Sequence, residues 1–199
     1  FRGGLQLALY DISAERLAHG ERLARRISEQ SGAGATVTAT LDRREALAGA
    51  RYVINEVQVG GYAATRADFD IPARYGVRQT IGDTLGVGGI FRALRTFPVL
   101  DGIAHDMARV CPGAVLLNYT NPMSMNVWYL AAAHPAINAV GLCHSVFWTV
   151  HGLCEVIGVP FDLQARPWDG PADLPTPSHK LLPRPSPIPP HLDDVADAA

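Results

Sequence analysis

The stretch Ala114-Val-Leu-Leu-Asn-Tyr-Thr-Asn-Pro-Met123 joins an apolar run to a polar turn and then to a helical pattern. Residues 114–118 are typical of a buried strand, because strands of parallel sheets are covered on both faces and form short apolar runs. Pro122 suits the first position of a helix, where its missing N–H would have no partner. The stretch therefore predicts a strand, a tight turn and a helix over residues 121–133.

The same alternation continues on both sides of this stretch. Strands are expected at residues 5–10, 36–40, 52–57 and 139–143, and helices at residues 14–30, 43–48, 89–110 and 145–157. Ser13 can cap the first of these helices, and Pro98 is expected to kink or break the third. Strands that alternate with helices predict right-handed βαβ units, which gives an α/β fold with a doubly wound parallel sheet.

Composition separates the chain into two parts and excludes some partners. Of the 199 residues, 48% are apolar, which is enough to form a core, and the net charge of −2 disfavours nucleic acid or an anionic membrane as partner. No apolar run is long enough to span a membrane. Three widely spaced cysteines favour the reducing cytoplasm. Residues 1–160 are expected to form the folded domain, and residues 161–199, with nine prolines, a disordered coil tail.

Polar residues and glycines follow the strands at the edge where ligands bind in such sheets. In open α/β sheets, ligands lie beyond the carboxyl ends of the strands. Here those ends are followed by Asp11, by residues 40–43, by Gln58-Val-Gly60-Gly61, by residues 118–122 and by Cys143-His144-Ser145. The sequence therefore predicts a ligand site at this edge.

Asp11 ends the first expected strand and has two interpretations. In a dinucleotide-binding fold, an acidic residue at the end of the second strand accepts hydrogen bonds from the adenosine ribose. Alternatively, Asp11 is a turn residue that precedes a helix and needs no ligand. The Gly-rich fingerprint of the first interpretation should lie about 20 residues upstream. Because only ten residues precede Asp11, either the fold is a different one or that loop and the first strand are expected before Phe1.

Four other segments could carry chemistry. Gly60-Gly61 and the Gly-rich run over residues 82–89 allow a backbone to approach a phosphate, although turns are the commoner use of such glycines. Within that run, Asp83 could serve as an acid, a base or a ligand. Asn121 could cap its helix or bind sugar hydroxyls. Cys143 could ligate a metal or act as a nucleophile with His144, although a buried cysteine is most often a small hydrophobe.

Five motifs, in this order and spacing, resemble glycoside hydrolase family 4, the NAD- and divalent-metal-dependent glycosidases. The resemblance covers about residues 7–160, and Cys-His-Ser-Val is similar to the α-galactosidase branch. The motifs are Gln58-Val-Gly-Gly61, Gln79-Thr-Ile-Gly-Asp-Thr-Leu-Gly86, Gly88-Gly-Ile-Phe-Arg-Ala-Leu-Arg-Thr96, Leu117-Asn-Tyr-Thr-Asn-Pro-Met123 and Gly141-Leu-Cys-His-Ser-Val146.

The resemblance implies a Rossmann-like fold and a redox-assisted glycosidase reaction. NAD⁺ removes hydride from C3 of the sugar, a base removes the acidified C2 proton, the aglycone leaves from C1, water adds, and hydride returns. This route differs from the usual two-carboxylate mechanism. A metal, usually Mn²⁺, polarises the C3 oxygen.

The resemblance also implies roles for single residues. Cys143 becomes a metal ligand and Asn121 a sugar-binding residue, while Asp83 or His144 assists departure of the aglycone. The NAD-binding residues are Asp11, Gln58, Gly60 and Gly61.

The sequence leaves other interpretations open. The substrate is an α-galactoside or, within the same family, an α-glucoside or α-glucuronide. One alternative is an oxidoreductase similar to lactate or malate dehydrogenase, which would not need Cys143. Another is a non-catalytic remnant that binds a dinucleotide without turning over any substrate. The family's Gly-x-Asn-His segment and its second domain are not among these residues. We therefore expect an inactive fragment of an enzyme whose intact form is a homo-oligomer.

Overall fold

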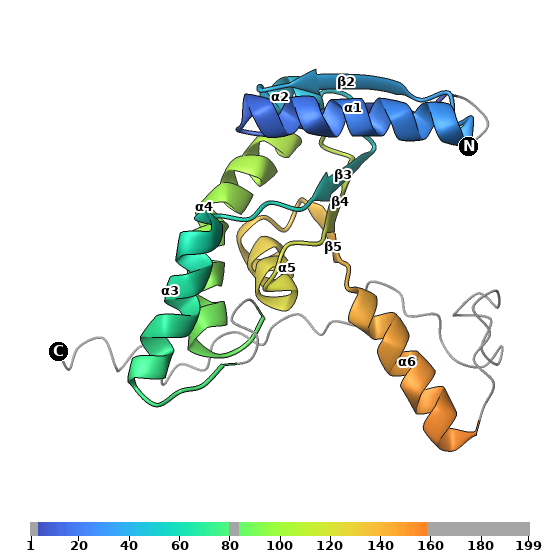
Figure 1. The fold of residues 1–199 in the computed structure, drawn as a ribbon. Coiled ribbons are helices and arrows are strands. Elements are labelled where there is room, and N and C mark those ends of the chain that lie inside the picture. The colour runs from blue at the N-terminus through green and yellow to red at the C-terminus, as the bar shows by residue number, and fades with distance from the viewer. Residues whose placement is uncertain (1–3, 80–83, 159–199) are drawn as a thin grey trace. The chain divides into compact units, whose positions relative to one another are not determined.

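The computed structural model describes residues 4–79 and 84–158. Within them the chain alternates strands and helices, as the sequence predicts (Figure 1). The strands are β1 (Gln6–Tyr10), β2 (Thr36–Thr40), β3 (Tyr52–Asn55), β4 (Val115–Asn118) and β5 (Asn138–Gly141). The helices are α1 (Ala14–Ser31), α2 (Arg43–Leu47), α3 (Gly61–Arg74), α4 (Gly86–Val110), α5 (Met123–Ala133) and α6 (His144–Ile157).

The strands pair only in parallel, in two sheets. One sheet holds β1 and β2, and the other has the order β3-β4-β5. The α/β class and the parallel pairing are thus confirmed, while the strands expected in one sheet form two. Among the described strands, neither β1 nor β3 has a partner on its second edge.

Local chemistry explains where α1 and α2 begin. The Ser13 hydroxyl accepts a hydrogen bond from the Arg16 N–H, which confirms the predicted cap. Asp42 caps α2 in the same way, through the N–H groups of Arg44 and Glu45. Helix α1 ends at Gly32, whose φ of 64° is the left-handed conformation that glycine adopts without steric cost.

Helix α3 is the element that sequence reasoning missed. It follows a glycine pair and contains Pro72 near its end, and both features are typical of loops. Asp68 and Pro72, one turn apart, are its buried residues, and the helix packs against α4. Packing against α4 therefore stabilises this helix more than the helical propensity of its own sequence does.

Other boundaries differ by a few residues. Helix α4 begins three residues before the predicted position 89 and runs through Pro98 without ending. The strand predicted over residues 52–57 ends at Asn55, where its partner β4 also ends. The pairing with β4 thus sets where β3 ends, and the apolar run alone overestimates the length of the strand.

The apolar core lies between α4, α5 and the β3-β4-β5 sheet. Leu100 and Met107 from α4, Leu116 from β4 and Leu130 from α5 are fully buried. Ala104 and Cys111 pack in the same cluster. This core positions the carboxyl ends of three neighbouring strands.

Helix α6 belongs to a second unit of the chain, which begins at Ser145. No helix in the described ranges is both long and apolar enough to cross a bilayer. The predicted end of the folded domain at residue 160 and the coil tail over residues 161–199 lie outside the described residues.

Candidate active site

The carboxyl ends of β3, β4 and β5 form one row of three residues. Asn55, Asn118 and Gly141 are register partners across the sheet. The candidate residues of the next three turns follow this row: Gln58 to Gly61 after β3, Asn121 after β4 and Cys143 after β5. The sheet therefore brings together three of the predicted segments.

Buried amide groups tie the first two turns together. The Asn55 Nδ2 group donates to Asn118 Oδ1 at 2.8 Å, and the Asn118 and Asn126 Nδ2 groups both donate to the Thr120 carbonyl. The Thr120 hydroxyl donates to the Val57 carbonyl at 3.0 Å. Among the described residues, no donor reaches the buried Asn55 Oδ1 or Asn126 Oδ1. Sequence reasoning missed this network, although an asparagine that closes two apolar strands was its signal.

The turn after β3 needs glycine for a steric reason. Gly60 has a φ of 89°, and a Cβ there would lie 2.5 Å from the Ala64 Cβ. Gly61 also has a positive φ, and a Cβ on it would meet only open space. The Gln58 amide holds the turn by donating to the Gly61 carbonyl and the Thr65 hydroxyl. This turn thus presents backbone at the start of α3, where a ligand can approach closely.

Two arginines of α4 fasten both turns. Arg95 Nε donates to the Val59 carbonyl at 3.1 Å, and its guanidinium pairs with the buried carboxylate of Asp68 at 2.6 Å. One helical turn earlier, Arg92 Nε donates to the Asn121 carbonyl at 3.3 Å. Both lie in a motif of the family resemblance, but the sequence indicated no role for either. Helix α4 therefore sets the spacing of Gly60 and Asn121.

Asn121 is not the cap of its helix. The N-cap of α5 is Pro122, which the sequence predicts at the first helical position, and the helix has no side-chain capping bond. The capping interpretation is therefore wrong. The half-buried Asn121 lies in the turn between β4 and α5, next to the guanidinium of Arg92.

Cys143 lies two residues after a close contact between β5 and α5. At Gly141 a Cβ would collide with the side chain of Met123, so only glycine lets α5 pack this closely on β5. Cys143, two residues later, is half-buried. In the described ranges, no group of three His, Cys, Asp or Glu side chains is placed to hold a metal ion. Cys143 can supply one thiolate ligand, and these residues do not complete a metal site.

Asp11 lies in the other sheet, directly after β1. Its Oδ1 accepts the Ser13 N–H at 2.7 Å and an Arg16 Nη2 donor at 2.6 Å, and its Oδ2 accepts Arg16 Nε at 3.1 Å. The hydrogen bond from Arg16 holds the pKa of Asp11 below its ordinary value, and the Ser13 N–H acts in the same direction. Asp11 thus makes the hydrogen bond of a turn residue that precedes a helix. The charged, partly exposed carboxylate also has the acceptor chemistry that ribose hydroxyls require.

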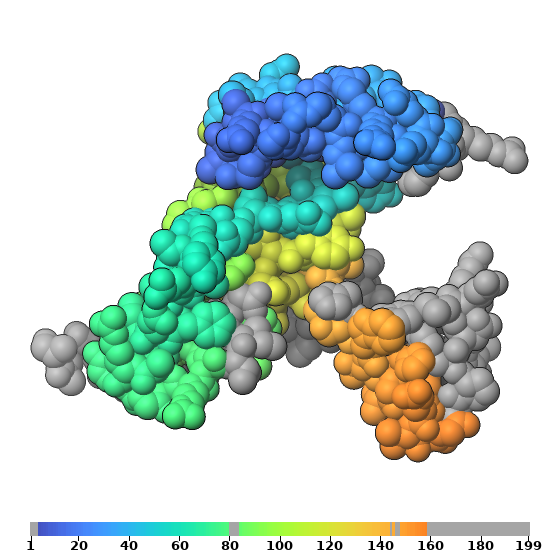
Figure 2. Space-filling view, viewed as in Figure 1, coloured from blue at the N-terminus to red at the C-terminus, as the bar shows by residue number. Residues whose placement is uncertain are grey.

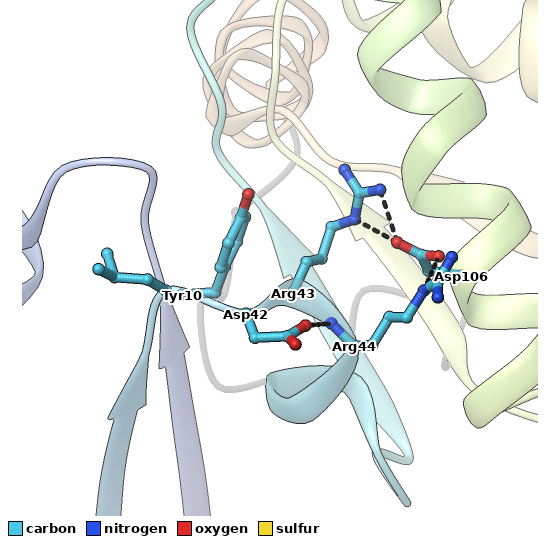
Figure 3. A pocket seen from close by; sticks show the side chains of 6 residues that line it. Tyr10, Asp42, Arg43, Arg44 and Asp106 are labelled. Carbon is cyan, nitrogen blue, oxygen red and sulfur yellow. Dashed lines mark hydrogen bonds and ion pairs between the residues drawn. The ribbon is translucent and has the colours of Figure 1, made fainter.

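An open pocket of about 610 Å³ lies beside Asp11, where β1 and β2 end. Figure 3 shows Arg43 and Arg44 of α2 converging on Asp106 of α4, with Tyr10 on the opposite side. Burial raises the pKa of Asp106, but the hydrogen bonds from Arg44 and Arg43 outweigh it and leave that pKa below its ordinary value. The sequence showed no sign of this contact, because its partners lie more than 60 residues apart.

The two predicted acid–base residues are not placed by the structure. Asp83 lies outside the described residues. His144 begins α6, but its side chain is also outside the description. The described residues that fit a dinucleotide are Asp11, with its carboxylate acceptors, and Gly60-Gly61, with its exposed backbone.

Comparison with known proteins covers the same region. The model of the family described as "Family 4 glycosyl hydrolase" matches residues 3–159. The chain is 45% identical over 160 residues to an α-galactosidase of Bacillus subtilis and 43% identical over 155 residues to one of Rhizobium meliloti. These matches cover 80% and 77% of this chain, but only 37% and 31% of the two relatives.

A solved 6-phospho-β-glucosidase from Thermotoga maritima, which contains manganese, NAD⁺ and glucose-6-phosphate, has the same fold. Its TM-score is 0.68 at 23% identity, and the match covers 78% of this chain and 37% of that one. The family match extends over most of the sequence and includes all five motifs. The chain belongs to glycosyl hydrolase family 4.

Proposed function

We propose that the complete protein hydrolyses terminal α-galactosides by NAD-dependent oxidation at C3, elimination and hydration, and that these residues form its dinucleotide-binding part. The observation that carries the proposal is the 43–45% identity to two α-galactosidases over the segment that holds all five motifs. The Cys143-His144-Ser145-Val146 tetrapeptide supports the same substrate.

Residues of this chain divide the work between cofactor and sugar. Bound NAD⁺ supplies a hydride acceptor. Asp11 accepts hydrogen bonds from the adenosine ribose, and the Gly60-Gly61 backbone allows close approach of the dinucleotide. Asn121 binds sugar hydroxyls at the neighbouring strand end. Arg92 and Arg95 hold these two turns at a constant spacing, which keeps the sugar close to the cofactor.

Asp83 and His144 are the candidates for moving the proton to the departing aglycone. Each lies within a motif of the family resemblance, Asp83 in residues 79–86 and His144 in residues 141–146. Cys143 is proposed as one ligand of a divalent metal, with manganese as its most suitable occupant, because the family neighbour contains that ion. The other ligands of that metal are not among the described residues.

The proposal is tested by assaying the complete protein on an aryl α-galactoside with NAD⁺, Mn²⁺ and a reductant. We expect hydrolysis that stops when either cofactor is removed. Cys143→Ser is expected to lose manganese binding, measured by calorimetry, while Cys154→Ser, a cysteine of α6, retains it. Hydrolysis that is equally fast without NAD⁺ would contradict the redox mechanism, and equal rates on an aryl α-glucoside would contradict the sugar assignment.

We further propose that residues 1–199 alone do not turn over substrate. Their described part offers one thiolate for the metal and no complete metal site. The check is the same assay on the purified 199-residue chain, in which hydrolysis of the aryl α-galactoside would refute this part of the proposal.

We also propose that the complete protein is a cytoplasmic homo-oligomer. The support is its family and the free thiols of the three cysteines among these 199 residues. Light scattering coupled to size-exclusion chromatography tests the oligomer, and fractionation of the source cells tests the location.

A further inference from the structure

The carboxylate of Asp11 is already paired before any ligand arrives. Arg16, in the first turn of α1, donates two hydrogen bonds to it, and the Ser13 N–H donates a third. A carboxylate has about four acceptor positions. Oδ2 accepts Arg16 Nε at 3.1 Å and has room for one ribose hydroxyl.

This pairing changes the charge at the place where two dinucleotides differ. NADP⁺ carries a phosphate on the 2′-oxygen of the adenosine ribose, whereas NAD⁺ carries a hydroxyl there. An unpaired acidic residue accepts the hydroxyl and repels the phosphate, while a nearby arginine accommodates the phosphate. Asp11 supplies the acidic group and Arg16 the arginine, and the net charge of the pair is close to zero.

Exposure allows Arg16 to take a second partner. Its side chain is 63% exposed, against 30% for that of Asp11. An exposed ion pair of this kind contributes little to stability and is readily rearranged. The guanidinium has five N–H donors, so Arg16 can donate to a phosphate while it still pairs with the carboxylate. The guanidinium fork also matches the geometry of phosphate oxygens.

We propose that Arg16 is a specificity-determining residue that lets this dinucleotide site accept NADP⁺ as well as NAD⁺. Arg16 donates to the 2′-phosphate of NADP⁺, and in the NAD⁺ complex it orients Asp11 toward the 2′-hydroxyl. The inference rests on the proposed function, because it needs the adenosine ribose at Asp11.

The experiment measures dissociation constants of both dinucleotides for the complete protein by isothermal titration calorimetry. For the natural sequence we expect the two constants to agree within roughly tenfold, a difference of about one charged hydrogen bond. Arg16→Gln should weaken NADP⁺ binding by roughly ten- to hundredfold, because it removes a charge-assisted contact. It should leave the NAD⁺ constant nearly unchanged.

Three further variants make the result specific. Arg16→Lys keeps the positive charge and should restore part of the NADP⁺ affinity. Asp11→Asn should weaken NAD⁺ more than NADP⁺. Arg26→Gln removes an exposed arginine of the same helix and should change neither constant.

Each other outcome overturns the inference in a recognisable way. If NAD⁺ binds and Arg16→Gln leaves the ratio of the two constants unchanged, Arg16 does not set specificity, while the proposed function stands. If Arg16→Gln and Arg26→Gln weaken NADP⁺ binding equally, the effect comes from the loss of one positive charge anywhere on the helix and not from a contact of Arg16. If neither dinucleotide binds the complete protein, the proposed function fails and this inference fails with it.

Discussion

The two sheets of this chain are held in place by different physics. Around β3, β4 and β5, four side chains from three elements are completely buried in one apolar cluster. In the region formed by β1, α1, β2 and α2, only Val37 and Leu47 are buried hydrophobic residues, and α1 has no buried residue at all. In the space-filling view the side chains of α1, in blue, lie on the outer surface (Figure 2).

Charged contacts take the place of burial in the β1-β2 region. Arg25 of α1 donates to the Val37 carbonyl of β2, and Asp106 of α4 pairs with two arginines of α2. The apolar region stays folded because water is excluded from it, whereas the β1-β2 region depends on a few polar contacts and on Leu47 of α2, which packs in the apolar cluster. This contrast places the proposed ribose residue, Asp11, in the less buried region and Asn121 and Cys143 beside the core.

The largest effect should come from the apolar cluster. Leu116→Ala is expected to lower the free energy of unfolding by about 2–5 kcal/mol, since it removes a fully buried side chain and leaves a cavity. Leu23→Ala on α1, where the side chain is 59% exposed, should change it by less than about 0.5 kcal/mol. Urea unfolding measures both, and equal losses would show that the two regions do not differ as described.

The next effect should come from the contact that joins the regions. Asp106→Asn removes the charge that binds Arg43 and Arg44, and we expect a loss of about 1–3 kcal/mol, because the carboxylate is nearly buried and its partners are half-exposed or exposed. Asp70→Asn, which breaks an exposed pair with Arg66, should cost less than about 1 kcal/mol. An Asp106→Asn variant as stable as the natural chain would contradict a bridging role.

A smaller effect is expected at the start of α1. Ser13→Ala removes the capping acceptor of the Arg16 N–H and should cost about 1 kcal/mol. Ser13→Asp retains an acceptor and should recover most of that loss. Thermal melting followed by circular dichroism distinguishes the two variants, and identical midpoints would show that this cap contributes nothing measurable.

The smallest change should be in the acid dependence of stability. The hydrogen bond from His134, followed by that from Tyr129, holds the pKa of Asp101 below its ordinary value of 3.8. A carboxylate with a lowered pKa stabilises the fold above its ordinary pKa, and the contribution is lost as pH falls through the folded value.

Asp101→Asn should therefore flatten the fall in stability below about pH 4, while leaving its slope above pH 5 unchanged. Urea unfolding between pH 3 and 6 measures it, with the exposed Glu29→Gln as control. A variant with the same acid slope as the natural chain would refute this contribution.

Much of the local structure could be predicted because its causes are local. Ser13 caps the helix that begins one residue later, and the apolar run at Gln6–Tyr10 forms the strand it indicates. Helix α3 could not be predicted, because its Gly60-Gly61 start and its Pro72 favour loops when taken alone. Its packing against α4 overrides those preferences.

The candidate site divides in the same way. The motifs identified Gly60-Gly61, Asn121 and Cys143, since residues at the carboxyl ends of parallel strands share one edge. They did not indicate a role for Arg92, Arg95 or Arg16, because an arginine in a helical pattern is most often an exposed surface residue. Only the structure shows that two of them fasten the site turns and that the third grips Asp11.

The sequence by itself determined the alternation of strands and helices, the helix cap at Ser13 and the family. Each of these depends on neighbouring residues or on the order of short motifs. Only the tertiary structure decided that Asn55, Asn118 and Gly141 form one row, that the strands divide into two sheets, and that Asp106 joins them through α2. Those features depend on contacts between residues far apart in the sequence, 63 positions for Asn55 with Asn118 and for Arg43 with Asp106. Such contacts follow from packing rather than from any local pattern.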